Sequence, residues 1–151
     1  MKRLFLIAAT VATVALPVSF VAVGLSATSA GAASPPACAK LSGNAFAGNF
    51  TISKCKPASK TNKTATGSGT ALAGGGGTIT WSPSGGTTEL SVSFNPAATN
   101  KCTKGNTEYI VSGTVSGGTS TYTAAGQTVL ADACVSGSGK LSLLKHTKMD
   151  L

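Results

Sequence analysis

The stretch from Cys102 to Cys134 restricts the possible folds more than any other part of the chain. Between the two cysteines lie three runs rich in threonine, valine and tyrosine, separated by glycine-containing breaks; they span 108–115, 119–125 and 128–135. Short β-favouring runs with such breaks are typical of antiparallel hairpins. The sequence therefore predicts a three-stranded meander with a cysteine at each end.

The first of these runs has two distinct faces. Side chains alternate along a strand, so Tyr109, Val111, Gly113 and Val115 share one face. This apolar face is predicted to point into the core. Ile110 lies on the opposite face and is predicted to point outward.

The N-terminal segment reads as an export signal. Lys2 and Arg3 precede an uncharged apolar run at 4–25, and Ala30-Gly31-Ala32 forms a small-residue cleavage site. This pattern predicts a secretory signal peptide at 1–32, which leaves 33–151 as a single secreted domain of about 118 residues. The apolar run also reaches the roughly 20 residues needed to cross a bilayer, so an uncleaved anchor is the alternative.

The four cysteines fit an oxidising compartment. An even number in a small exported chain predicts two disulfides. Pairing of Cys38 with Cys55 and of Cys102 with Cys134 is favoured, since each bridge then closes over neighbouring hairpins; two other pairings stay open. There is no C-x-x-C spacing and only one histidine, so no metal site and no cofactor is predicted.

The rest of the chain adds further strands. The clearest hairpin joins 78–82 to 87–95 through Pro83-Ser84-Gly85-Gly86, with Ile79 and Trp81 on the same apolar face as Leu90, Val92 and Phe94. Other strands are predicted at 50–56, 64–73 and 140–144, a short one in the tail, an extended lead-in at 34–44, and a flexible turn at the glycines 74–77.

About eight short strands without a helix after the signal predict an all-β fold. An antiparallel β-sandwich is favoured because the strands do not have the even lengths expected of a closed sheet. A small β-barrel is the alternative.

Charge sets limits on the partners. After the signal there are ten lysines and four carboxylates, and Arg3 is the only arginine. Protein surfaces that bind nucleic acid use arginine side chains and stacked aromatic rings. Since neither is indicated after the signal, no nucleic-acid partner is predicted. The cluster Lys54, Lys56, Lys60 and Lys63 is either a solvated basic loop or a surface that attracts an acidic envelope polymer.

Catalytic chemistry is not indicated. His146 is the only histidine and lies in a charged tail, there is no G-x-S-x-G motif, and no motif supports a carboxylate pair. The sequence therefore predicts a protein that is not an enzyme.

Three aromatic residues are candidates for ligand contact. Trp81, Tyr109 and Tyr122 could form a platform for sugar rings, because aromatic rings present large amphipathic faces. The alternative places Trp81 in the core beside Leu90 and Val92, because large aromatic side chains dominate small cores.

These observations leave three classes of function. The first is a secreted, non-catalytic binding or structural module of the cell envelope or the extracellular space, with a polymer or a protein as partner. The second is an inhibitor of an extracellular enzyme that presents the loop at 96–106 around Cys102. The third is an assembling surface or pore-type protein, joined through Ile110 and Leu130.

Three blocks of the sequence resemble a known group. TITWSPSGGTTELSVSF, CTKGNTEYIVSGTVSGGTSTYT and DACVSGSGKLSL are similar to segments of uncharacterised small secreted β-rich proteins of actinobacteria. The resemblance extends from about Cys38 to the end of the chain. It implies secretion and a β-rich fold, and it implies no activity.

The exported protein is expected to begin at about Ala33 and to contain no free thiol. N-terminal sequencing of the product and thiol labelling under native conditions would check the two statements. A membrane-bound product that starts at Met1, or a labelled cysteine, would contradict them.

Overall fold

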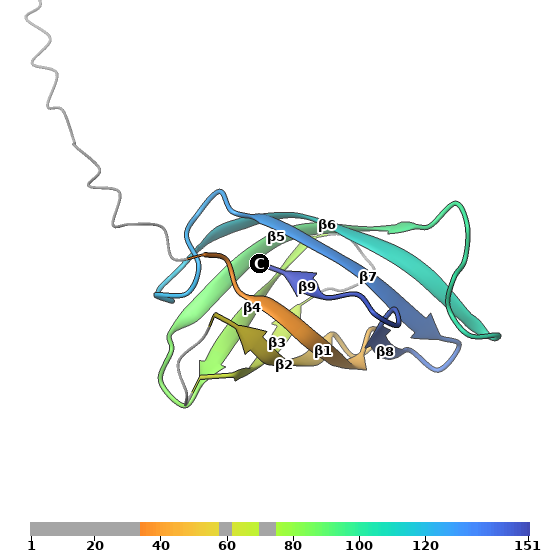
Figure 1. Ribbon diagram of the computed structural model, residues 1–151, viewed down its shortest axis with the longest axis horizontal. Coiled ribbons are helices and arrows are strands. Elements are labelled where there is room, and N and C mark those ends of the chain that lie inside the picture. The colour runs from red at the N-terminus through yellow and green to blue at the C-terminus, as the bar shows by residue number, and fades with distance from the viewer. Residues whose placement is uncertain (1–33, 58–61, 70–74) are drawn as a thin grey trace, which may run out of the picture.

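The computed structural model describes residues 34–57, 62–69 and 75–151, and its regular structure there consists of nine β-strands (Figure 1). The predicted signal peptide at 1–32 lies outside the described residues. The strands are β1 (Ala37–Asn44), β2 (Asn49–Lys56), β3 (Thr64–Gly69), β4 (Gly75–Ser82), β5 (Thr87–Pro96), β6 (Asn106–Gly118), β7 (Thr128–Ser136), β8 (Lys140–Leu143) and β9 (Met149–Asp150).

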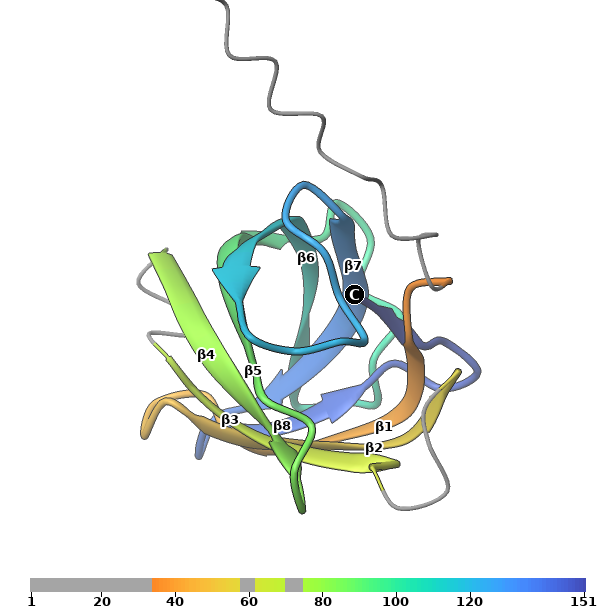
Figure 2. The ribbon, with the colours of Figure 1, turned by 90° about the vertical axis from the view of Figure 1, so that its left-hand side faces the viewer.

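The sheet closes into a barrel. Each strand from β1 to β7 pairs antiparallel with the next one, and β8 pairs with β1, so that the strands form a ring when viewed along the barrel (Figure 2). The all-β antiparallel prediction is confirmed, whereas the favoured sandwich is wrong and the barrel alternative is right.

The strand position that closes the barrel, between β7 and β1, explains why the strand lengths wrongly favoured a sandwich. It is shared by two short strands: β8 pairs with Ser42, Gly43 and Asn44 of β1, and β9 pairs with Ala37 and Cys38. Both also pair with β7. The ring therefore has eight positions, and the segment 144–148 interrupts the last of them.

Three local predictions need correction. Segment 34–44 is not a mere lead-in, because it contains β1. Segment 119–125 is not a strand: β6 pairs directly with β7, from Asn106 opposite Ser136 to Thr114 opposite Thr128. Of the turn predicted at 74–77, Gly74 lies outside the described residues, and glycines 75–77 are not a turn, because they belong to β4 and pair with β5.

The hairpin predicted around Pro83-Ser84-Gly85-Gly86 is present as β4 and β5. The core contains Ile79, Trp81 and Leu90, with Val92 and Phe94 packed against it. In β6, Val111 and Val115 are buried, and Tyr109 is half-buried against the core. The predicted inward faces of both segments are thus confirmed.

The disulfides have the pairing that the sequence favoured, Cys38 with Cys55 and Cys102 with Cys134. Cys38 and Cys55 are opposite each other on β1 and β2 and are buried in the core. Ile52 is buried as well, although it is three residues from Cys55. Strict alternation would place these two on opposite faces, and the left-handed backbone of Lys54 (φ 58°) between them shifts the alternation.

The second disulfide lies on the outside of the barrel. Cys134 is opposite Glu108 in the β6–β7 pair, and Cys102 belongs to the β5–β6 connection. The bridge therefore holds this connection against the outer face of the sheet.

Within the part of the chain that the structure describes, there is no helix with the length and apolar character needed to cross a membrane.

Replacing Cys102 and Cys134 by alanine is expected to lower the free energy of unfolding by about 3–4 kcal/mol, an upper value from the loop entropy of the unfolded chain. Urea unfolding would measure the loss. Lys104→Ala, in the same connection, is the control and should change stability by less than about 0.5 kcal/mol. A double variant as stable as this control would contradict the expectation.

Candidate functional site

The two ends of the barrel are built differently, and one is closed by a cluster around Trp81. This side chain is 1% exposed, and its Nε1 donates a hydrogen bond of 3.0 Å to Oγ1 of Thr88. The Thr88 hydroxyl is 2.7 Å from that of Thr123, and the Tyr122 ring lies edge-on to the indole with centroids 5.1 Å apart. The connection 119–127 thus covers this end, which we call the Trp81 end.

The covering segment is tied down by its backbone. Thr119 N–H donates to the Thr87 carbonyl at 2.8 Å, and Gly126 N–H donates to the Val115 carbonyl at 2.8 Å. Seen along the barrel, the connection passes in front of the ring of strands (Figure 2). Three threonines and a tyrosine in a β-favouring composition made this segment resemble a strand, but its hydrogen bonds fasten it across the barrel end.

The C-terminus completes the closure. Leu151 is fully buried, and its N–H donates a hydrogen bond of 3.1 Å to the carbonyl of Pro36, which is also fully buried. The last residue of the chain and the segment before β1 therefore fill the remaining space near Trp81.

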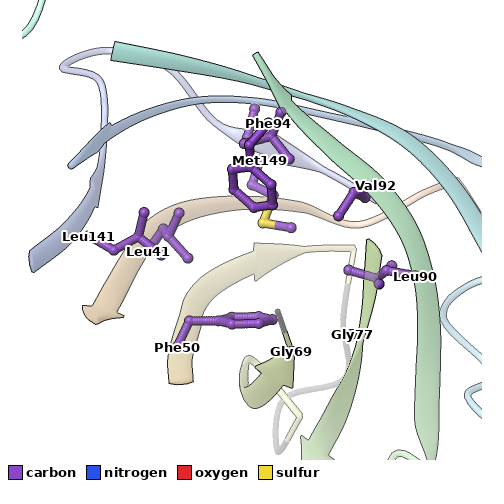
Figure 3. Close-up of a pocket in the computed structure, with 12 residues that line it drawn as sticks. Leu41, Phe50, Gly69, Gly77, Leu90, Val92, Phe94, Leu141 and Met149 are labelled. Carbon is purple, nitrogen blue, oxygen red and sulfur yellow. The ribbon is translucent and has the colours of Figure 1, made fainter. Parts of the chain in front are cut away.

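The other half of the barrel contains an apolar cavity of about 40 Å³. Figure 3 shows its side chains pointing toward one another from strands around the ring. None of the twelve lining residues has a polar side chain; they are Leu41, Phe50, Gly69, Gly76, Gly77, Leu90, Val92, Phe94, Val111, Ala131, Leu141 and Met149.

The cavity reaches the surface at the end opposite Trp81. Its deep residues, such as Leu90, Val111 and Leu141, are buried. Phe50 near the start of β2 is half-buried, as are Val92 and Phe94 in the second half of β5. Because these strand segments approach the same rim, the half-exposed rings mark the mouth, and we call this the Phe50 end.

Glycines shape this part of the wall. A Cβ at Gly67 would overlap the ring of Phe50, so the glycine leaves room for the ring beside β3. Gly69 and Gly77 are paired on β3 and β4 and present only backbone to the cavity. Bulky inward side chains fill a small barrel, so the glycines leave space that other residues would occupy.

Sequence reasoning missed this site. The sequence predicted a strand at 64–73, but it assigned the glycines from 74 to 77 to a turn. The useful signal is the recurrence of glycine at inward positions of two consecutive strands, Gly67, Gly69 and Gly77.

The apolar lining of the cavity can bury the hydrocarbon surface of a ligand. Its lining supplies no acid, base or nucleophile. Across 34–57, 62–69 and 75–151, no group of three or more histidine, cysteine or acidic residues is arranged to hold a metal ion.

The predicted aromatic residues do not meet at one place. Trp81 and Tyr122 are in contact, whereas Tyr109 lies near the start of β6, toward the Phe50 end. Since Trp81 is buried, its ring packs in the core, which is the alternative that the sequence left open for it.

The connection 97–105 is held in shape on the outside of the barrel. Glu108 is 3% exposed, and its Oε2 accepts a hydrogen bond of 2.5 Å from the N–H of Lys101. Asn100 Nδ2 donates to the Asn106 carbonyl at 2.7 Å, and Asn100 Oδ1 accepts from the N–H of Cys102 at 3.1 Å. An ordered exposed loop suits the inhibitor alternative, which stays a prediction.

Other predicted residues lie on the outer surface. Ile110 and Leu130 are 43% and 48% exposed on the neighbouring strands β6 and β7. They do point outward, and their role in assembly stays a prediction. His146 is exposed in the segment between β8 and β9.

Comparison of the chain with protein-family models, with curated proteins and with solved structures yields no match.

Gly67→Ala is expected to destabilise the protein by about 1–3 kcal/mol, because the added methyl group overlaps the Phe50 ring. Adding Phe50→Ala should relieve the overlap, so the loss in the double variant should be smaller than the sum of the single losses. Denaturant unfolding of the three variants measures this coupling.

Gly137→Ala is the matched control, since a Cβ there meets no atom within 4 Å. Equal losses for Gly67→Ala and Gly137→Ala, or strict additivity with Phe50→Ala, would contradict the described packing.

Proposed function

We propose that this protein is a secreted, non-catalytic binding protein that takes a hydrocarbon chain of its ligand into the Phe50 end of the barrel. The observation that carries the proposal is a cavity lined entirely by apolar residues, closed toward Trp81 and half-exposed at Phe50. Ligand pockets are concave and mostly apolar, and the mouths of β-barrels are a common place for them.

The size of the cavity limits what can enter. A water needs about 10–15 Å³, whereas an engineered cavity of about 150 Å³ holds benzene. At about 40 Å³ the cavity accepts the end of an alkyl chain and excludes a ring system unless the wall moves. A longer chain would continue past Phe50, Val92 and Phe94 at the mouth, and its polar group would stay in solvent.

The driving force is removal of hydrocarbon from water. Each buried methylene contributes about 0.8 kcal/mol, which is roughly a fourfold gain in affinity. The cavity alone would thus contribute only a few kcal/mol, and useful affinity needs further contact with the aromatic side chains of the mouth. The two disulfides are compatible with an extracellular protein, which agrees with the proposed role of a secreted binding protein.

Ligands with one polar head group and alkyl chains of about four to twelve carbons should bind with affinity that rises about fourfold per methylene and then levels off. Isothermal titration calorimetry would measure the series, and burial of apolar surface should give a negative heat-capacity change. Absence of binding, or affinity independent of chain length, would contradict the proposal.

Ala131→Leu should weaken binding by at least tenfold, because Ala131 lines the cavity and the larger side chain fills it. Thr114→Leu adds the same side chain on the exposed outer face of β6 and is the control. If Ala131→Leu proves unstable, Val92→Phe at the half-exposed mouth makes the same test. Unchanged affinity in both cavity variants would contradict the assignment of the site.

A further inference from the structure

Charge is unevenly distributed around the barrel. The first acidic residue of the chain is Glu89, so the whole stretch that forms β1, β2, β3 and β4 has no carboxylate. These four strands are consecutive in the ring and make up one half of its wall. The lysines of this half therefore have no acidic neighbour on their own strands.

Four exposed lysines lie close together on β1, on β2 and directly before β3: Lys40, Lys54, Lys56 and Lys63. Lys60, which the sequence grouped with the last three, lies outside the described residues. Lys40 is opposite Ser53 on the neighbouring strand, so it lies beside Lys54. The Lys63 carbonyl accepts a hydrogen bond of 3.3 Å from the N–H of Cys55, which places Lys63 next to both Lys54 and Lys56. We call these four residues the lysine face.

The carboxylates are elsewhere. Glu89 and Asp132 belong to β5 and β7, and Glu108 is buried under the β5–β6 connection. By register, Asp150 is the carboxylate nearest to the lysine face. It is opposite Ala37 of β1, and Ala37 is opposite Lys56 of β2, so β1 lies between Asp150 and Lys56. Two strand spacings put about 10 Å between the backbones of Asp150 and Lys56.

We propose that the lysine face binds a linear polyanion, a flexible polymer with a repeated phosphodiester or carboxylate group. Ammonium groups act as point charges and need no fixed ligand geometry, unlike the guanidinium fork. A repeated anion can therefore contact several lysines in turn. Release of counterions from the polymer supplies most of the binding free energy.

The chemistry of the face argues against nucleic acid. The outward side chains among the lysines are small: Ala39, Ser42, Thr51, Ser53, Thr64 and Thr66. None of them offers an aromatic surface on which bases stack. The face thus recognises charge density along a backbone and has no means of reading bases.

This surface is separate from the cavity. Lys54 and Lys56 lie at the end of β2 that is farther from Phe50. A polymer bound there leaves the Phe50 end accessible, so the protein can be retained on an anionic polymer while its cavity stays available. Binding of a polymer at the lysine face is independent of the proposed alkyl ligand.

The test uses the mature protein with poly(glycerol phosphate) and with polygalacturonate as probes, titrated by calorimetry at several salt concentrations. Binding of either polymer is expected, weakening with salt at a log–log slope of about −2 to −3, which is about −0.7 for each of four neutralised groups. The polymer bound more tightly identifies the anionic group. No binding of either probe at low salt would overturn the proposal.

Two triple variants that remove the same charge distinguish binding by the lysine face from attraction by the net charge of the protein. The triple variant Lys54→Gln, Lys56→Gln, Lys63→Gln is expected to bind at least tenfold more weakly with a shallower salt slope. The control Lys101→Gln, Lys104→Gln, Lys140→Gln removes the same charge away from the face and should change affinity less than threefold.

Two further results would count against the lysine face. Equal weakening in the two triple variants would show that only net charge matters. Tighter binding of an oligothymidylate than of both polymers, at equal charge, would show that bases are recognised. All variants replace exposed lysines, and thermal unfolding should confirm that each one is folded.

Discussion

The pairing of β1 with β8 and β9 is the interaction on which the rest of the structure depends. It joins the two ends of the sheet, so that neither β1 nor β8 has an unpaired edge. It also turns the inward faces of all the strands toward one common core. The buried disulfide between Cys38 and Cys55 fastens β1 to β2 at the same place, and the apolar cavity exists only because the wall is complete.

The two ends of this barrel differ because different segments cover them. The connection 119–127, Pro36 and Leu151 fill the space around Trp81. At the other end the wall contains glycines of β3 and β4, and Phe50 rests against one of them. A binding site at the Phe50 end and a rigid end at Trp81 follow from this asymmetry. The charge distribution adds a second asymmetry around the circumference, with the lysine face on β1, on β2 and directly before β3.

The predictions that succeeded depend on neighbouring residues. Alternation of apolar and polar residues identified the β4–β5 hairpin and the inward face of β6, and the spacing of the cysteines favoured the pairing that the structure has. The strand prediction at 119–125 was wrong. The composition favours a strand, but the N–H groups of Thr119 and Ser120 both donate to the Thr87 carbonyl, and the Thr123 hydroxyl bonds that of Thr88. The cavity was not predicted because the glycines at 74–77 were interpreted as turn residues. In the structure, glycines of β4 are strand residues that leave space inside the barrel because they have no side chain.

The sequence by itself determined an all-β chain with two disulfides, its hairpins, their inward faces and the excess of lysine, since each depends on residue type and on spacing along the chain. Only the tertiary structure decided that the sheet is a barrel, where its cavity opens, and which lysines gather on one face. The reason is distance along the chain: β1 meets β8 about 100 residues later, across a position split between two short strands, and no local pattern specifies such a contact.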